Sequence, residues 1–193
     1  MVICVYGAAS DNIDKSYVNA TEELGLRMAK RGHSLVFGAG GNGLMGAVAN
    51  GVSKGGGRVK GVIPTFFTDS NVEIVSKQCD EVVYTETMRE RKQEMEDSAD
   101  AFIMVPGGIG TFEEFYEILT AKQLLQHNKP IAVFNINGYF NELQHMMRVA
   151  VDKGFIKEGV LTLYTVFNNI DEMLDFVETD KGSGLGLDEL KRN

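Results

Sequence analysis

Short apolar runs rich in β-branched residues alternate along this chain with longer segments in which apolar residues recur at helical spacing. This alternation is typical of βαβ units, in which successive strands pair in parallel and a helix makes each crossover. With their turns, the strands are expected at residues 2–7, 34–41, 58–64, 80–86, 101–108 and 130–135, and the helices at 16–32, 43–56, 87–99, from about 111, 138–153 and 170–177. The sequence therefore predicts an α/β fold, a Rossmann-like doubly wound parallel sheet with helices on both faces, whose ligands bind beyond the carboxyl ends of the strands.

Chain length sets the expected domain organisation. With 193 residues and 44% hydrophobic content, the chain is long enough for one well-buried core. We expect a single domain over residues 1–178. Residues 179–193 are polar and contain several glycines, so we expect them to form a mobile tail.

Charge and composition argue against several classes of partner. A formal net charge of −8 and a pI near 4.9 disfavour a surface built for nucleic acid or anionic lipid. No apolar run reaches the roughly 18 to 20 residues that a membrane span needs, and the first residues lack the basic region of a secretory signal, so a cytoplasmic protein is expected. Cys4 and Cys79 match neither a disulfide framework nor a metal-binding spacing, so free thiols and no metal are expected.

Three turns at the predicted carboxyl edge, residues 6–10, 38–46 and 106–111, are rich in glycine and small residues. Glycine lets backbone N–H groups approach an anion closely, and a following helix adds the positive end of its dipole. The candidate binding residues in these turns are Gly7, Ser10, Gly40, Gly43, Pro106, Gly107, Gly108, Gly110 and Thr111. The alternative is that the glycines only permit tight turns, although three such turns in one sheet favour binding.

Gly38, Gly40 and Gly43 also fit the G-x-G-x-x-G pattern of dinucleotide-binding proteins. That pattern normally follows the first strand and is answered about 20 residues later by an acidic residue at the end of the next strand. Here it follows the second strand, and the next strand ends at Pro64 with no acidic residue before Asp69. The context therefore disfavours NAD.

A helix beginning near Thr111 would place Glu114 in line with Ile118 on an apolar stripe, while Glu113 and Glu117 would face solvent. Thr111 and Glu114 have the spacing of a capping box, in which the glutamate bonds back to the N-cap N–H group. A carboxylate in a semi-apolar cleft also tends toward a raised pKa, which suits a general base. The two interpretations are compatible, and spacing alone leaves both open.

Residues 87–96 raise a similar question, because a helix here draws Arg91 and Lys92 toward its buried side. Met88 and Met95 form the apolar line that these cations flank. Either the two side chains keep their charged heads in water, or they meet a phosphate or carboxylate at the edge of a cleft. Spacing favours neither alternative.

Two of these segments together resemble a known signature. "MRERKQEM" and "PGGIGTFEE" are similar to the paired M-x-x-R-K and P-G-G-x-G-T-x-x-E motifs of the Lonely Guy (LOG) family, the cytokinin-activating nucleoside 5′-monophosphate phosphoribohydrolases, and the similarity extends over residues 2–165. Members often carry the label "lysine decarboxylase", which implies pyridoxal phosphate. This chain offers no persuasive lysine site for that cofactor.

The resemblance implies an enzyme that hydrolyses the N-glycosidic bond of adenine-type nucleoside 5′-monophosphates, cytokinin riboside 5′-monophosphate or AMP, to free base and ribose 5-phosphate. It also implies a Rossmann-like fold, no cofactor or metal, and a homodimer or multiple of dimers. Arg91 and Glu114 match the family's catalytic residues, and the turn at 106–111 would hold the 5′-phosphate. The resemblance further assigns to the nucleotide site Met88, Lys92, the turn at 38–46 and Glu81. A non-catalytic nucleotide-binding or carrier protein is the alternative, because it would use the same turns without needing Glu114.

The chain departs from the family pattern at three places. Ala8 and Ala9 stand where hydroxyl residues are common, Ala39 interrupts a frequent triple glycine, and Ala121 replaces a large aromatic residue. These differences bear on which base is accepted. The missing aromatic side chain at Ala121 is expected to widen or reshape the cleft.

Overall fold

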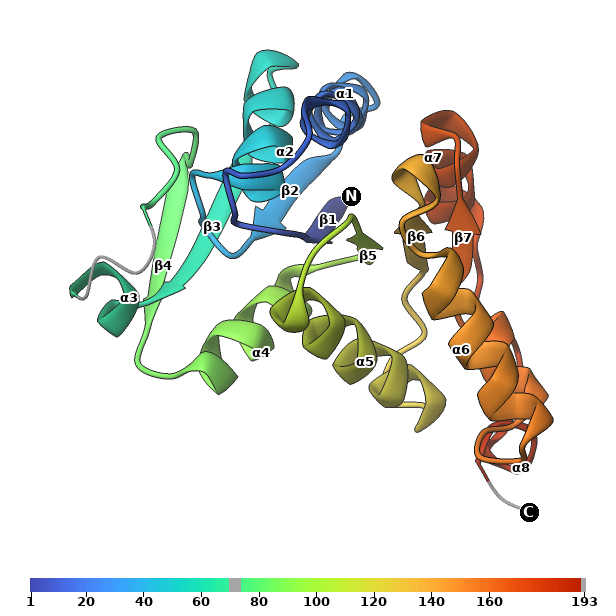
Figure 1. Cartoon of the computed structure of the whole chain (residues 1–193). Coiled ribbons are helices and arrows are strands. Elements are labelled where there is room, and N and C mark those ends of the chain that lie inside the picture. The colour runs from blue at the N-terminus through green and yellow to red at the C-terminus, as the bar shows by residue number, and fades with distance from the viewer. Residues whose placement is uncertain (70–73, 192–193) are drawn as a thin grey trace.

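The computed structural model describes residues 1–69 and 74–191, and seven strands of this part of the chain form one parallel sheet (Figure 1). The strands are β1 (Val2–Tyr6), β2 (Ser34–Phe37), β3 (Val59–Pro64), β4 (Glu81–Thr85), β5 (Ala101–Met104), β6 (Ile131–Phe134) and β7 (Thr165–Phe167). Their order in the sheet is β4-β3-β2-β1-β5-β6-β7. The chain winds outward from β1 to β4, crosses back to β5 beside β1, and continues in the other direction. The predicted doubly wound α/β fold is confirmed.

The strand order reverses between β1 and β5, which pair with each other in parallel. At such a switch point the connections leave the carboxyl edge of the sheet in opposite directions and open a crevice between them. The loops that follow β1 and β5 meet there, since the N–H group of Ala8 donates to the carbonyl of Pro106 at 3.1 Å. The fold therefore joins two of the three predicted turns where doubly wound proteins bind ligands.

Helices cover both faces of the sheet (Figure 1). They are α1 (Lys15–Lys30), α2 (Gly43–Lys54), α3 (Thr65–Asp69), α4 (Met88–Ser98), α5 (Ile109–Gln123), α6 (Asn141–Asp152), α7 (Ile170–Thr179) and α8 (Leu187–Leu190), with 3-10 turns η1 (Ile136–Gly138) and η2 (Glu158–Thr162). One buried cluster joins the sheet to α1, α2 and α7 through residues such as Leu24, Val48 and Leu174. A second cluster joins the other face to α4, α5 and α6, and includes Met95 and Phe115.

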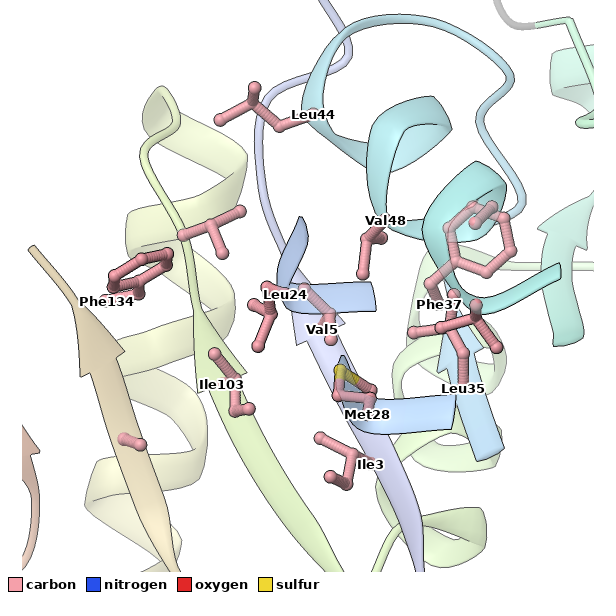
Figure 2. Packing of buried hydrophobic residues seen from close by; sticks show 14 of the residues in the cluster. Ile3, Val5, Leu24, Met28, Leu35, Phe37, Leu44, Val48, Ile103 and Phe134 are labelled. Atoms are coloured by element: carbon pink, nitrogen blue, oxygen red, sulfur yellow. The ribbon is translucent and has the colours of Figure 1, made fainter. Parts of the chain in front are cut away.

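The two clusters follow from the alternation of side chains along each strand. In β1, Ile3 and Val5 belong to the first cluster, whereas Cys4 and Tyr6 belong to the second. Figure 2 shows Val5 beside Leu24 of α1, and Ile3 beside Met28 of the same helix. Because both faces are covered, the central strands are apolar on both sides, which explains why they form continuous apolar runs in the sequence.

Strand β7 and the start of α5 differ from the prediction. β7 has three half-buried residues, too few for a strand pattern to stand out from a loop.

α5 begins at Ile109 with Gly108 as its N-cap, and no side chain of the described residues caps it. The capping-box prediction is therefore wrong, because Thr111 lies inside the first turn and is buried. Thr111 packs closely over the preceding loop, where a Cβ at Gly107 would lie 2.1 Å from its Oγ1.

The segment after α7, predicted to be a mobile tail, packs against the rest of the molecule as far as the structure describes it. Leu190 of α8 is fully buried in the second cluster, and Leu185 packs against the same cluster. The carbonyl of Leu190 accepts a hydrogen bond from Nε2 of Gln123 at 2.8 Å. Residues 192–193 of the predicted tail lie outside the described residues. Among the helices that the structure describes, none is long and apolar enough to cross a membrane.

Candidate active site

A cavity of about 410 Å³ is lined by the loop after β1 together with residues of α2, α3, α4 and α5. Eight of the predicted site residues line it: Gly7, Ser10, Met88, Arg91, Gly108, Gly110, Thr111 and Glu114. The remaining lining residues are Ala8, Ala9, Met45 and Phe67. The cavity therefore lies at the carboxyl edge of the sheet, beside the switch point, as the fold class predicts.

Arg91 is oriented by two backbone carbonyls at this edge of the sheet. Its side chain is only 7% exposed. The Nε atom donates to the carbonyl of Val62 at 3.1 Å, and Nη2 donates to the carbonyl of Gly38 at 3.2 Å. Arg91 therefore does not extend its charged head into bulk water. With Nε and Nη2 engaged, Nη1 is the nitrogen that lies near Glu114.

Glu114 projects from α5 toward the same space, and its side chain is 12% exposed. Its Oε1 lies 3.9 Å from Nη1 of Arg91. Because both groups are largely shielded from water, salt screens their charges less than it screens surface charges. The neighbouring Glu113 and Glu117 are 52% and 42% exposed, in agreement with the predicted faces of the helix. The structure thus brings together the two residues that the sequence motifs single out.

The first turn of α5 presents backbone N–H groups beside this pair. Within residues 1–69 and 74–191, no hydrogen-bond acceptor is found for the N–H groups of Ile109, Gly110 and Thr111. A Cβ added at Gly108 or Gly110 would meet no atom within 4 Å, so there is open space in front of this helix end. Unpaired N–H groups and the positive end of the helix dipole make such a terminus suitable for an anion.

The N-terminus of α2 is instead used by the protein itself. The N–H group of Leu44 donates to the carbonyl of Ala8 at 2.8 Å, and that of Gly43 donates to Oδ1 of Asp11 at 3.1 Å. A Cβ at Gly43 would lie 2.6 Å from the carbonyl oxygen of Ala8. Glycine at this position allows the loop after β1 to approach α2. The predicted binding role of Gly43 is not supported, since the residue does not line the cavity.

The other glycines of this turn also have structural partners. A Cβ at Gly38 would lie 1.7 Å from Nη2 of Arg91, so this glycine makes room for the guanidinium. Gly40 pairs with Val75 in an isolated antiparallel bridge and does not line the cavity. The turn follows β2 rather than a strand at the switch point, so it lacks the structural context of a dinucleotide fingerprint.

Glu81 lies at the opposite edge of the sheet from the cavity. It is the first residue of β4, and in a parallel sheet the first residues of the strands lie at the amino edge. Its Oε2 is 3.1 Å from Nη2 of Arg58. The strand expected at residues 80–86 already has Glu81 near its start, so the role that the resemblance implies for Glu81 conflicts with binding at the carboxyl edge. The structure therefore does not bring this predicted residue into the site.

Lys92 points to the outer side of the site rather than into it. Its Nζ lies 2.5 Å from carboxylate oxygens of both Glu113 and Glu117. Partial burial lowers the pKa of Lys92, but hydrogen bonds to these two carboxylates raise it to a net value above the usual one. Lys92 thus fastens α4 to α5, the helices that carry Arg91 and Glu114.

Pro106 and Gly107 line a neighbouring cavity of about 250 Å³ instead of the main one. Tyr17 and Tyr139 form part of its wall, and the hydroxyl of Tyr139 donates to the carbonyl of Gly107 at 2.7 Å. The two cavities share Ala8, Ser10 and Gly108 in their linings. Pro106 and Gly107 therefore belong to the wall of the neighbouring cavity.

Sequence reasoning missed Phe67 and Met45 as lining residues. The signal for Phe67 was present, because Thr65 and then two phenylalanines follow Pro64, the last residue of β3. Ala121 does not line the cavity, so the absence of an aromatic side chain there does not reshape it as expected. The aromatic side chain of the site comes from α3 instead.

Comparisons with known proteins agree with these motifs. A protein-family profile described as "Possible lysine decarboxylase" matches residues 45–177. The cytokinin riboside 5′-monophosphate phosphoribohydrolase LOG2 of Arabidopsis thaliana is 36% identical over 176 residues, which are 91% of this chain and 82% of that protein. LOG7 of the same plant is 39% identical over 176 residues, 91% of this chain and 80% of that protein.

Solved structures similar to this chain include the molybdenum cofactor carrier protein of Chlamydomonas reinhardtii, with a TM-score of 0.70, 22% identity and coverage of 92% of this chain and 95% of that chain. The molybdenum cofactor binding protein of Rippkaea orientalis has a TM-score of 0.69 and 19% identity, and the match covers 92% of this chain and 94% of that protein's chain. At these identities the similarity shows the fold alone. The family match and the plant relatives, by contrast, extend over most of the chain. The chain belongs to the LOG family of cytokinin riboside 5′-monophosphate phosphoribohydrolases.

Proposed function

We propose that this protein hydrolyses the N-glycosidic bond of adenine-type nucleoside 5′-monophosphates, using water to release free base and ribose 5-phosphate. The observation that carries the proposal is the placement of Arg91 and Glu114 3.9 Å apart in one cavity, with the open N-terminus of α5 beside them. The names of the plant relatives support the same reaction class and suggest cytokinin riboside 5′-monophosphate as substrate. AMP carries the same adenine, ribose and 5′-phosphate groups and is the second candidate.

The 5′-phosphate is proposed to bind at the start of α5. The N–H groups of Ile109, Gly110 and Thr111 and the helix dipole supply positive potential there, and Gly108 and Gly110 leave room for phosphate oxygens. Ser10 lines the same cavity and can donate a hydroxyl hydrogen bond. An anchored phosphate would use its binding energy to hold the ribose in position for reaction.

Glu114 and Arg91 are proposed to act on the ribose. Breaking the N-glycosidic bond builds positive charge on the sugar ring while the bonding electrons leave with the base. The Glu114 carboxylate would stabilise that charge or take a proton from the attacking water, whose oxygen forms the new bond to the sugar. Arg91 would orient the sugar or Glu114 through Nη1, since its Nε and Nη2 are held by backbone carbonyls.

A base-release assay tests the proposal directly. The purified protein is incubated with AMP, GMP, CMP, UMP and isopentenyladenosine monophosphate, and free bases are separated by chromatography. We expect release of adenine or its prenylated form together with an equal amount of ribose 5-phosphate. Binding of these nucleotides without release of base would instead identify a carrier protein. A thermal shift with NAD and none with AMP would favour the dinucleotide alternative.

Substitutions at Glu114 and Arg91 test the assigned roles. Glu114→Gln and Arg91→Ala are each expected to lower kcat by about 10² to 10⁴-fold, the usual range for a lost acid–base or charge-stabilising group. Glu172→Gln is the control, because it makes the same change at an exposed carboxylate of α7 that does not line the cavity. Circular dichroism checks that each variant stays folded. Near-normal turnover in either site variant would contradict its role.

We further infer that the protein forms a homodimer through one face of α5 and α6. Ile109 and Tyr116 of α5 and Met146 of α6 are exposed, and the contact of the Tyr116 hydroxyl with Sδ of Met147 at 3.8 Å places the two helices side by side. Large exposed apolar groups that adjoin one another are typical of protein interfaces.

A cytoplasmic location is proposed from the two free thiols, Cys4 and Cys79, and cell fractionation tests it.

A further inference from the structure

Phe67 is the single aromatic side chain among the described residues that line the main cavity. It belongs to α3, the short helix that begins immediately after the last residue of β3. Its ring packs edge-to-face against Phe66, with centroids 4.9 Å apart. The ring centroid is also 5.9 Å from Cζ of Arg91, within the range of a cation–π contact. These contacts hold an aromatic surface next to the catalytic arginine candidate.

A series of contacts links groups that line the cavity. Gly108 and Ser10 are shared with the neighbouring cavity, and Gly108 is the N-cap of α5, where we place the phosphate. Glu114 follows in the second turn of the same helix, and its Oε1 lies 3.9 Å from Nη1 of Arg91. Cζ of Arg91 in turn lies 5.9 Å from the centroid of the Phe67 ring. A nucleoside monophosphate has the same order of groups: phosphate, ribose with its glycosidic bond, and base.

We infer that Phe67 is the stacking platform for the base of the substrate and sets the preference for purines. This inference rests on the proposed function, since it assumes that the phosphate binds at α5 and that the glycosidic bond lies between Glu114 and Arg91. A purine presents a larger π-face to the ring than a pyrimidine does. Met88 also lines the cavity, with its Sδ 4.0 Å from Nη1 of Arg91, and adds polarizable apolar surface near the base.

The neighbouring cavity fits the base less well in this arrangement. It shares Ala8, Ser10 and Gly108 with the main cavity, but neither Arg91 nor Glu114 lines it. A base placed there would lie apart from the two groups that are proposed to act on its glycosidic bond. The order of contacts therefore assigns the base to the Phe67 end of the main cavity.

The test compares ligands with and without a base. Phe67→Leu keeps an apolar side chain in place and removes the aromatic face. We expect it to raise KM for AMP about 5- to 150-fold, the range that follows from the loss of one base-stacking contact. The inhibition constant of ribose 5-phosphate, which has no base, should stay within about twofold. Phe67→Tyr keeps the aromatic ring, so its KM for AMP should match that of the wild type.

Phe155→Leu is the matched control, because it makes the same change at a side chain that is 83% exposed and absent from the cavity lining. It should leave KM for AMP within about twofold of wild type, because no stacking contact with a base is lost. The preference for AMP over UMP should fall in Phe67→Leu and stay unchanged in Phe155→Leu. A merely structural role for Phe67 would change KM for AMP and the inhibition constant of ribose 5-phosphate together, and that result would overturn the inference.

The outcomes separate this inference from the proposed function. If wild type releases base but Phe67→Leu keeps its KM and its preference for AMP, the inference is wrong and the function stands. If wild type releases no base from any nucleotide, the proposed function fails, and calorimetric binding of AMP and ribose 5-phosphate to wild type and Phe67→Leu still decides the inference. Weakening of AMP binding by Tyr17→Leu, with Phe67→Leu silent, would place the base in the neighbouring cavity.

Discussion

Gly38 illustrates how one residue positions another far along the chain. Arg91 lies 53 residues away in the sequence, yet its Nη2 donates to the carbonyl of Gly38 and occupies the space that a Cβ would fill. The glycine resembled part of a dinucleotide fingerprint in the sequence, but the close approach that it permits is to a guanidinium. Its structural role therefore differs from the one that its local pattern suggests.

Gly38→Ala is expected to lower kcat about 10-fold or more with little loss of stability, because the added Cβ displaces the flexible end of the Arg91 side chain rather than backbone. The measurement is steady-state base release together with urea unfolding. A double-mutant cycle supplies the control, since Gly38→Ala should have little effect when Arg91→Ala is already present. Additive losses in the double variant would show that Gly38 acts independently of Arg91.

Helix α4 carries Arg91, and polar contacts at both of its sides hold it in place. Lys92 joins it to α5 through Glu113 and Glu117. Lys60 of β3 joins it to the sheet, since Nζ donates to Oε1 of Glu94 at 2.7 Å. The hydrogen bond from Lys60 is the main cause that lowers the pKa of Glu94 below its usual value. The element that presents the arginine is thus fixed by charge pairs as well as by Met95 in the core.

The Lys60–Glu94 pair predicts a specific pH dependence of stability. A carboxylate whose pKa is lowered by folding adds stability above its unfolded pKa of about 4.3, and this contribution is lost as the pH falls through the lower folded pKa. Because Glu94 is 38% exposed, solvent screening limits the contribution to about 0.2 to 1 kcal/mol. Urea unfolding of Lys60→Met, Glu94→Gln and the double variant should give this coupling at pH 7. The coupling should vanish in acid, and an undiminished coupling there would contradict the assignment.

At the scale of the whole molecule, the order of strands decides which loops can form a site. The switch point between β1 and β5 brings the loop after β1 next to the start of α5. The segment after β2 contacts the same loop, since the N–H group of Leu44 donates to the carbonyl of Ala8. The exposed apolar face includes Ile109 and Tyr116 of α5, and α5 is also the helix that carries Glu114. An interface there would connect assembly to the site through α5.

Tyr116→Glu combined with Met146→Glu is expected to convert the proposed dimer to a monomer, because two charges would be buried at the interface without partners. Sedimentation velocity at micromolar concentration measures the change. Tyr84→Glu serves as the control, since Tyr84 is 58% exposed on β4, the strand at one end of the sheet. A monomeric wild type would refute the homodimer, and a dimeric double variant would place the interface elsewhere.

The sequence by itself determined the α/β class, the positions of six strands, and the two segments that carry Arg91 and Glu114. These features depend on periodicity and local spacing, which a single chain displays directly. The buried side of α4 and the inward position of Glu114 were likewise predictable from 100° per residue.

Only the tertiary structure decided which candidates meet in space. It turned Lys92 toward α5, began that helix at Ile109, and brought Phe67 beside Arg91. The physical reason is that these outcomes depend on contacts between segments distant in sequence. The local sequence pattern indicates on which face of a helix or strand a residue lies, whereas tertiary packing determines which residues that face contacts.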